Sequence, residues 1–241
     1  MTKVKYLIKK ITLALIPSPI RNWMIESFME NKGIYYSQEG EDIILERIFG
    51  AQSSGFYLDV GAHHPTRFSN THKLYLRGWN GINIDATPGS MIPFRKLRKR
   101  DINLESGVSD TEGKITYYQF NEPAINTFSK ERSEFVLAKS NYKLIATVDV
   151  QTRRLENILK DHLSENQSID LLTIDVEGLD FAILGSNNWN THRPRVILVE
   201  ELENTLEKVL TSKTYLFLSS KKYHLFSKMF NTLIFIDSTK K

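Results

Sequence analysis

Short apolar runs alternate with amphipathic stretches along most of this chain. The first half predicts helices over residues 37–50, 70–77 and 88–97, and strands over residues 55–61, 81–85 and 101–108. Apolar positions recur every three to four residues in the helical stretches, whereas the strand segments are short continuous runs, as expected for buried strands. Strands that alternate with helices predict a parallel, doubly wound sheet.

The pattern changes after Gly113. Residues 114–120 alternate, residues 121–150 show no helical period, and together they predict an inserted hairpin region. The rest predicts helices over 155–163, 181–184 and 203–211, and strands over 169–174, 195–199, 223–226 and 233–236. Because the last two strands have no helix between them, they predict an antiparallel edge. We expect one α/β domain over residues 34–241.

The start of the chain combines apolar positions with lysines and predicts a helical extension over residues 1–33. Lys9 and Lys10 interrupt the apolar stretch, so it matches neither a signal peptide nor a spanning helix of about 20 apolar residues. A basic amphipathic helix suits the surface of an anionic membrane. The alternative is a helix packed on the body of the protein.

Composition narrows the classes of site. The chain has 241 residues, 41% of them hydrophobic, which is enough for a sizeable core, and no cysteine. The absence of cysteine excludes disulfides, thiolate metal sites and cysteine nucleophiles. A net charge of +4 is mild for this length, so the location of the charges matters more than their sum.

Two acidic residues close the first two predicted strands of the body. Asp59 precedes Gly61, and Asp85 ends the next strand, where a carboxylate can accept both hydroxyl protons of a ribose. A nucleoside-bearing cofactor is therefore expected. The second and third glycines of a dinucleotide site are missing, and Asp59 would repel a pyrophosphate. S-adenosylmethionine, which carries an ammonium and a sulfonium but no phosphate, suits these residues better; a turn glycine with solvated carboxylates is the alternative.

Several spaced motifs then resemble one family. They are Ser37-Gln38-Glu39-Gly40-Glu41-Asp42, the segment 56–62, Gly78-Trp79 with Gly81, Val108-Ser109-Asp110 with Gly113, and Ile174-Asp175-Val176-Glu177-Gly178. In order and spacing, residues 35–236 are similar to the FkbM-type S-adenosylmethionine-dependent methyltransferases. The resemblance implies a class I methyltransferase fold, a Rossmann-like three-layer sandwich with a seven-stranded, mostly parallel sheet whose last strand is antiparallel.

The resemblance also implies roles for individual residues. Asp59 and Gly61 would lie at the methionine end of the cofactor, Asp85 at the ribose, Ser109 and Asp110 at the adenine, and Gln38 nearby. The His63-His64-Pro65 loop departs from the family, because many members carry a small or amide residue there. The implied activity is O-methylation, often of sugars in glycosides, lipopolysaccharide or other surface glycans.

A sugar hydroxyl needs a base or a metal ion to lower its pKa before it attacks a methyl group. Asp175, Glu177, Glu200 and Glu201 follow two apolar strands, and carboxylates at neighbouring strand ends suit Mg²⁺ or another hard cation. The arrangement is similar to metal-dependent sugar O-methyltransferases, which makes Asp175, Glu200 and Glu201 the metal ligands and Glu177 the base. The alternative is that these carboxylates serve the N-termini of the following helices.

Two other features carry candidate chemistry. His63 and His64 are a second choice of base, since a loop histidine can take a proton at neutral pH, although capping a turn is an equal alternative. The basic run Arg95–Arg100 predicts a solvated helix end, with a phosphate or an anionic glycolipid as the sharper alternative. We expect no nucleic-acid partner, because the Asp-Pro-Pro-aromatic type of strand-end motif is missing. Tyr117, Tyr118 and Asn126 of the insert are acceptor-site candidates.

The sequence therefore predicts an S-adenosylmethionine-dependent O-methyltransferase of bacterial type. Its acceptor would be a sugar hydroxyl of a glycan, a glycolipid or a glycosylated metabolite. The alternatives are a dinucleotide-dependent sugar-modifying enzyme and a non-catalytic Rossmann-like binding module. The expected location is the cytoplasm, with peripheral contact to the inner face of the membrane through the basic N-terminal helix.

Overall fold

The computed structural model describes residue 17, residues 35–202 and residues 205–240. Met1–Tyr35 and Tyr36–Lys241 form two compact units. The helical extension predicted over residues 1–33 lies outside the described residues, apart from residue 17. All the described helices and strands belong to the second unit.

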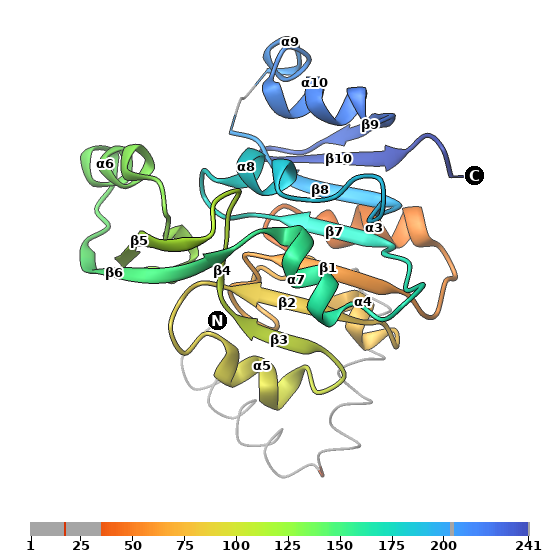
Figure 1. Cartoon of the computed structure of the whole chain (residues 1–241), viewed down its shortest axis with the longest axis horizontal. Coiled ribbons are helices and arrows are strands. Elements are labelled where there is room, and N and C mark those ends of the chain that lie inside the picture. Colours follow the sequence, from red (N-terminus) through yellow and green to blue (C-terminus); the bar gives the residue numbers. More distant parts are fainter. Residues whose placement is uncertain (1–16, 18–34, 203–204, 241) are drawn as a thin grey trace, which may run out of the picture. The chain divides into compact units, whose positions relative to one another are not determined.

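A seven-stranded sheet forms the centre of this unit (Figure 1). Its strands are β1 (Phe56–Val60), β2 (Asn80–Asp85), β3 (Ile102–Glu105), β7 (Leu171–Ile174), β8 (Val196–Glu200), β9 (Tyr223–Lys228) and β10 (Thr232–Asp237). They lie in the order β3-β2-β1-β7-β8-β10-β9. The last strand in the chain, β10, runs antiparallel to both neighbours, whereas the pairs from β3 to β8 are parallel. This confirms the predicted fold class. The order of strands reverses between β1 and β7, where ligands of such sheets bind.

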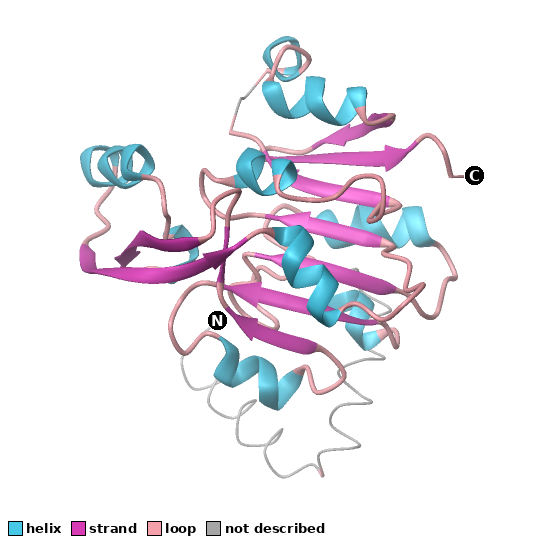
Figure 2. Cartoon of the chain, viewed as in Figure 1, coloured by secondary structure: helices cyan, strands magenta, loops and turns pink. Residues whose placement is uncertain are grey.

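Helices cover both faces of the sheet (Figure 2). They are α3 (Glu41–Phe49), α4 (His72–Leu76), α5 (Met91–Leu97), α7 (Leu155–His162), α8 (Asp180–Gly185), α9 (Leu206–Val209) and α10 (Lys213–Ser220). Successive residues of β1 point to opposite faces, as a strand's period of two requires. Leu58 packs against α7 and α8 on one face, and Tyr57 packs against α3 and α4 on the other. The result is the expected three-layer sandwich.

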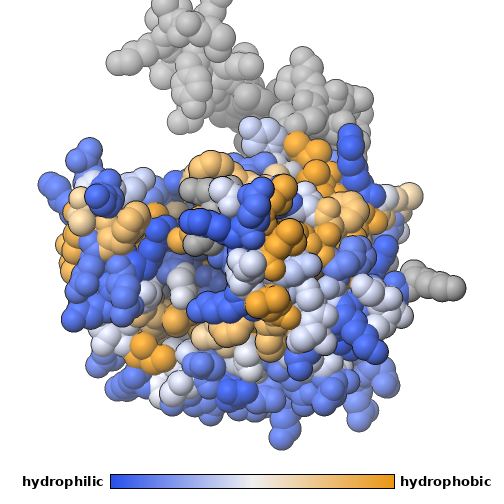
Figure 3. Space-filling model, turned by 90° about the horizontal axis from the view of Figure 1, so that it is seen from above, coloured by the Kyte–Doolittle hydropathy of each residue, from blue (hydrophilic) through white to orange (hydrophobic). Residues whose placement is uncertain are grey.

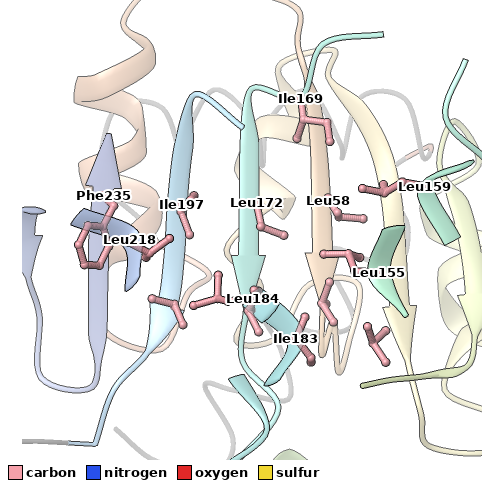
Figure 4. Close-up of a cluster of buried hydrophobic side chains, with 14 of the residues drawn as sticks. Leu58, Leu155, Leu159, Ile169, Leu172, Ile183, Leu184, Ile197, Leu218 and Phe235 are labelled. Atoms are coloured by element: carbon pink, nitrogen blue, oxygen red, sulfur yellow. The ribbon is translucent and has the colours of Figure 1, made fainter. Parts of the chain in front are cut away.

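The larger core cluster fills the space between the sheet and α7, α8 and α10 (Figure 4). Leu58, Leu172 and Ile197, from three adjacent strands, are completely buried there. Burial of each such side chain stabilises the folded protein by about 1.5–3 kcal/mol relative to leaving it exposed. This rigid layer fixes the carboxyl ends of β1, β7 and β8 relative to one another.

The insert forms a second, three-stranded sheet in the order β4-β6-β5, from β4 (Gly107–Val108), β5 (Gly113–Phe120) and β6 (Leu144–Arg153). The antiparallel pair of β5 and β6 is the predicted hairpin. The prediction that this region contains no helix was wrong. A short turn of 3₁₀ helix, η1 (Pro123–Ile125), and the helix α6 (Lys130–Lys139) connect the two strands. Because α6 buries only Ser133 and Val136, it has too small an apolar face to produce a helical period in the sequence.

Two further predictions need correction. The strand expected over residues 101–108 is broken at Ser106, so that β3 joins the main sheet and β4 joins the insert. The helix expected over 203–211 is described only from Leu206 to Val209, and α10 was not predicted at all. No helix in the described part of the chain has the length and apolar character needed to cross a bilayer.

Candidate active site

A narrow cavity of about 40 Å³ lies at the carboxyl ends of β1 and β2, under the insert. Gly61, Asp85, Val108 and Asp175 are among the residues that line it. The insert contributes two aromatic rings, Tyr117 and Phe128, which pack on each other with centroids 4.5 Å apart, and Asn126. We refer to this space as the cofactor cavity, because it lies at the expected ligand position of the sheet.

The carboxylate of Asp85 is held in a fixed orientation at this cavity. One oxygen accepts the backbone N–H of His63 at 2.9 Å, and the other accepts the backbone N–H of Thr87 at 2.8 Å. Each carboxylate oxygen has a second lone pair, so both oxygens can still accept a hydrogen bond from a hydroxyl group. The position and orientation suit the diol of a ribose.

Gly61 is required by close packing between two strand ends. Its φ is +82°, and a Cβ atom added to it would lie 1.8 Å from the backbone oxygen of Asp175. No side chain fits at that distance. Glycine therefore lets the end of β1 meet the end of β7, which brings Asp175 to the cofactor cavity.

Asp59 lies beneath the cavity and is not among its lining residues. Its Oδ2 accepts the hydroxyl of Thr71 at 2.7 Å, and Thr71 in turn accepts from Arg98 at 3.0 Å. Burial raises the pKa of Asp59 to about 6. The residue predicted to hold the methionine end of a cofactor thus belongs to a buried polar network.

Arg98 is the centre of that network and is fully buried. It donates to the carbonyl of Pro65 at 3.0 Å and to the hydroxyl of Tyr57 at 3.0 Å. The basic run Arg95–Arg100 is therefore not uniformly solvated. Arg98, one residue of this run, links the loop that follows Gly61 to the main sheet through its hydrogen bonds to Pro65 and Tyr57.

Three carboxylates meet at the ends of β7 and β8. Oxygen atoms of Asp175, Glu177 and Glu200 all lie within 4.8 Å of one another. We call these residues the acidic cluster. Glu201 does not belong to it, and its backbone N–H donates to the carbonyl of Asn231. The structure thus brings two of the three predicted metal ligands together with the predicted base.

The acidic cluster disfavours full ionisation. The surrounding protein raises the pKa of Asp175 well above its usual value, and the charge of Glu177 adds to this effect. Burial and the neighbouring Asp175 raise the pKa of Glu200 in the same way. Asp180, whose pKa burial raises to about 7, accepts the backbone N–H groups of Val176 and Gly178 and so fixes the turn after β7.

Glu177 is tied to the insert. Its Oε2 accepts from Nε of Arg132 at 2.9 Å and from Nη2 at 2.6 Å, and its carbonyl accepts the hydroxyl of Thr127 at 2.6 Å. The φ of Glu177 is +55°, a conformation that non-glycine residues adopt rarely and that is often found at functional sites. The ion pair gives this carboxylate a cationic partner within the chain.

A second, more open pocket of about 450 Å³ lies on the other side of Glu200. Phe181, Glu200, Glu201, Lys208 and Lys213 are among its lining residues. We call it the acceptor pocket. The acidic cluster therefore lies between the two pockets. The cofactor cavity is at the carboxyl ends of β1 and β2, and the acceptor pocket is lined by residues of β8, α8 and α10.

The two candidate histidines differ in their surroundings. Nδ1 of His64 accepts the backbone N–H groups of Thr66 and Arg67 at 3.2 and 3.0 Å, so this ring caps a turn. His63 lines the cofactor cavity with a φ of +52°, and its buried Nε2 has no hydrogen-bond partner among the described residues. Burial lowers the pKa of both rings, which favours their neutral form.

The remaining predicted cofactor residues lie elsewhere. Gln38 is exposed in the loop before α3, Asp110 is exposed after β4, and Ser109 is buried with its hydroxyl 3.3 Å from Asp110. None of the three is among the described residues that line the cofactor cavity. Val108 and Ser106, which precede the Ser109-Asp110 pair, line it instead.

Sequence reasoning missed Thr127, Arg132, Asp180 and Arg98. Asp180 had a usable signal, because an Asp at the start of a helix often accepts the backbone N–H groups of the turn two to four positions before it. Arg98 stands in a basic run, and such a run predicts side chains exposed to solvent. Only the structure shows that Arg98 is buried. Thr127 and Arg132 lie in the insert, where no periodicity indicated which residues would face the sheet.

Comparison with known proteins adds an independent finding. A family model described as the methyltransferase FkbM domain matches residues 59–225. A solved structure, described as methyltransferase FkbM from Methylobacillus flagellatus KT, is similar with 11% sequence identity and a TM-score of 0.47. The match covers 76% of this chain and 44% of that chain, so this chain spans less than half the length of the solved one. No curated protein matches.

Proposed function

This chain belongs to the FkbM methyltransferase family and is a methyltransferase, and from this premise we propose that it methylates a sugar hydroxyl with S-adenosylmethionine as donor. The observation that carries the proposal is the position of the acidic cluster between the cofactor cavity and the acceptor pocket. A carboxylate at this boundary would lie close to the methyl donor on one side and to the acceptor hydroxyl on the other. The proposed setting is the cytoplasm.

The residues of the cofactor cavity fit this donor chemically. Ile84, Val108 and Phe128 supply apolar walls for an adenine ring, and Asp85 supplies oriented acceptors for a ribose diol. Asp175, at the same cavity, offers negative charge to an ammonium or a sulfonium. When bound, S-adenosylmethionine would supply an electrophilic methyl carbon. Because the cavity is narrow, Tyr117 and Phe128 of the insert must shift to admit it.

The acceptor pocket fits a polyhydroxylated ligand. Its carboxylates accept hydroxyl protons, its lysines donate, and the ring of Phe181, with Nζ of Lys213 4.8 Å from its centroid, offers an apolar surface. Sugars present hydroxyl groups together with apolar C–H faces. Pocket chemistry therefore supports a sugar as the acceptor.

We assign the proton acceptor to Asp175. Its side chain is exposed and lines the cofactor cavity, and its pKa is raised, whereas Glu177 is paired with Arg132. Asp175 would take the proton of the acceptor hydroxyl as its oxygen receives the methyl group that the bound donor would supply. Holding the two reactants in line supplies most of the rate enhancement.

The alternative for the acidic cluster is a hard divalent cation such as Mg²⁺. Asp175 and Glu200, both oxygen donors on neighbouring strand ends, are the residues that would hold it. A cation there would lower the pKa of the acceptor hydroxyl. Chelation distinguishes the two assignments.

Two measurements test the function. Calorimetric titration should show binding of S-adenosylmethionine and no binding of NAD; the reverse would support a dinucleotide-dependent enzyme instead. Mass spectrometry of surface glycans from a strain without the gene should show the loss of one methyl group. The wild-type gene should restore it, and a gene encoding Asp175→Asn should not. Unchanged glycans in the deleted strain would contradict a glycan acceptor.

A further inference from the structure

The cofactor cavity is smaller than the ligand that its residues fit. Its volume of about 40 Å³ holds a few water molecules, whereas pockets for organic ligands of about the size of S-adenosylmethionine measure roughly 300–1,000 Å³. Tyr117, Pro123, Asn126 and Phe128, all from the insert, are among its lining residues. The insert therefore occupies part of the space that a bound donor would need.

Backbone hydrogen bonds join the insert to the main body of the unit, the seven-stranded sheet with its helices, only at the base of the insert. Thr152 of β6 pairs there with Gly107 of β4 and with Gly113 of β5. Above this base, residues 115–150 form their backbone–backbone hydrogen bonds with one another and with no other described residue. The hairpin and α6 can therefore move together without breaking a strand pair.

Within the described part of the chain, polar side chains hold the insert against three residues of the main body, Arg67, Thr87 and Glu177. Their partners on the insert are Glu122 for Arg67, Tyr117 and Asn126 for Thr87, and Thr127 and Arg132 for Glu177. The contacts to Arg67 and Glu177 include ion pairs with N–O distances of 3.0 and 2.6 Å, and we call these two ion pairs the latch. Because every one of these contacts involves a side chain, rotation of that side chain can release it.

The insert also lies outside the hydrophobic core of the main sheet. Among the described residues, none between 115 and 150 belongs to either of the two large core clusters. Phe135 and Ile145 of the insert are 55% and 66% exposed, and apolar surface is visible on the insert at the left of Figure 3. Movement of the insert away from the main body would therefore leave that core intact.

The insert thus has the connections of a movable cover. We propose that residues 115–150 form a lid, held shut by the latch, which swings away from the cofactor cavity as one body to admit the methyl donor. Gly113, at the start of β5, has a φ of +134°, and nothing lies within 4 Å of a Cβ atom added there, so the base of the lid has room to bend.

The lid has a consequence for binding. Only the open form can take up the donor, so the apparent affinity for the donor falls with the fraction of molecules in which the lid is closed. The identity of the donor rests on the proposed function, whereas the opening of the lid does not.

Labelling of a single cysteine tests whether the lid opens, because the chain itself contains none. Val108→Cys places a thiol at the cavity, in a residue that is 4% exposed, where a maleimide reagent can reach it only when the lid is open. Val196→Cys, at a completely buried residue of β8, is the matched control, since its thiol is exposed only when the main sheet unfolds. Val108→Cys should be labelled at least about a hundredfold faster than Val196→Cys, because opening of the lid is a smaller step than global unfolding.

Removal of the latch should speed this labelling. Arg67→Met/Arg132→Met in the Val108→Cys background is expected to be labelled at least about tenfold faster than Val108→Cys alone, since two ion pairs no longer oppose opening. Lys130→Met is the control and should leave the rate unchanged, because the exposed Lys130–Glu134 pair joins two residues of the lid itself.

A reversible cross-link connects the lid to donor binding. A Cβ atom added to Gly178 would lie 3.3 Å from Cβ of Ser129, which immediately precedes α6, and a disulfide spans roughly 3.5–4.5 Å between Cβ atoms. The oxidised variant Ser129→Cys/Gly178→Cys, with its disulfide verified by mass spectrometry, should bind S-adenosylmethionine at least about tenfold more weakly than the same protein after reduction. The reduced form is the matched control, because it carries the same substitutions and the same strain at Gly178, whose φ is +114°.

Three outcomes would overturn the proposal. The first is labelling of Val108→Cys no faster than that of Val196→Cys, which would mean that the cavity opens only when the protein unfolds. The second is an unchanged labelling rate after removal of the latch. The third is equally tight binding of S-adenosylmethionine by the oxidised and reduced forms of the cross-linked variant. Failure of the wild type to bind S-adenosylmethionine would instead contradict the proposed donor, and the labelling rates would still decide whether the lid opens.

Discussion

Arg132, on the helix of the insert, donates two hydrogen bonds to one carboxylate oxygen of Glu177, at the end of the central strand β7. Both side chains are mostly shielded from solvent, with 21% and 13% exposed. The pair joins the region that covers the cofactor cavity to the acidic cluster. It therefore couples the position of the insert to the charge of the site.

Removal of this ion pair should loosen the insert. Arg132→Met is expected to lower the free energy of unfolding by about 1–3 kcal/mol, because a partly buried charged acceptor loses its partner. Limited proteolysis with chymotrypsin should also cleave faster at Phe135, which is exposed on the same helix. Lys130→Met is the control, since the Lys130–Glu134 pair on α6 is exposed and contributes about 0.5 kcal/mol or less. Equal effects of the two variants would contradict a role for Arg132 in holding the insert.

Methyl transfer should depend on an ionised Asp175. A base acts only when deprotonated, and the pKa of Asp175 is raised above its usual value, so turnover is expected to rise with pH through that raised pKa. Asp175→Asn should lower turnover by about a hundredfold or more. The assay would follow labelled methyl groups from S-adenosylmethionine into glycans of the gene-deleted strain. Glu165→Gln, at an exposed carboxylate in the loop before β7, is the control.

Chelation separates a proton acceptor from a metal site. We expect full activity in excess EDTA, because Asp175 takes the proton directly. Loss of activity on chelation, restored by Mg²⁺, would instead make Asp175 and Glu200 metal ligands. Calorimetric titration of Mg²⁺ alone into the wild type and into Glu200→Gln supplies a readout that does not depend on the acceptor.

Gly61→Ala should damage the junction of β1 and β7. The added methyl group would meet a backbone oxygen at 1.8 Å and occupy a residue with positive φ, which alone costs roughly 1–2 kcal/mol. Urea unfolding should show a loss of more than about 3 kcal/mol, as for other overpacked sites, or a protein that fails to fold. Gly185→Ala is the control, because nothing lies within 4 Å of its added Cβ, and its stability should match or exceed the wild type. A mild effect of Gly61→Ala would show that the two strand ends are free to separate.

The buried Asp59 should make folding sensitive to pH. Its pKa is about 6 in the folded protein and about 3.9 in an unfolded chain. The folded state therefore retains a proton that the unfolded state releases. The associated stabilisation is complete below pH of about 3.9 and is lost as the pH rises to about 6, by roughly 3 kcal/mol in total.

Asp59→Asn removes this titration. Urea unfolding at several pH values between 4 and 7 should show that the wild type loses stability relative to Asp59→Asn as the pH rises. Asp110→Asn, at an exposed site, should keep the wild-type profile. A constant difference between the wild type and Asp59→Asn would mean that Asp59 is already ionised at pH 4 in the folded protein.

His64 should be structural. Because its Nδ1 accepts two backbone N–H groups, His64→Ala is expected to destabilise the loop by about 1–2 kcal/mol, while His64→Asn keeps an acceptor and recovers part of that loss. Turnover of His63→Ala and His64→Ala should stay within about tenfold of the wild type if Asp175 is the base. A loss of a hundredfold or more in His63→Ala, with unchanged binding of S-adenosylmethionine, would move the base to His63.

The sequence alone determined the seven strands of the main sheet and the helices between most of them, the antiparallel end of the sheet and the residues that stand at strand ends. Those features follow from local periodicity, and the ends of parallel strands must lie at one edge of the sheet. Asp85, Asp175 and Glu200 were found in this way. The helix α6 was missed, because a helix that buries two residues leaves almost no pattern.

Tertiary structure alone decided which polar side chains face the site. Asp59 lies one residue before the end of β1 and Asp85 ends the neighbouring strand β2, yet Asp59 turns toward Thr71 and Arg98 while Asp85 turns toward the cavity. Glu177, rather than Glu201, completes the acidic cluster, and Arg132 from a distant segment pairs with it. Burial, pairing and pKa depend on contacts between residues far apart in the chain, and periodicity carries no information about those contacts.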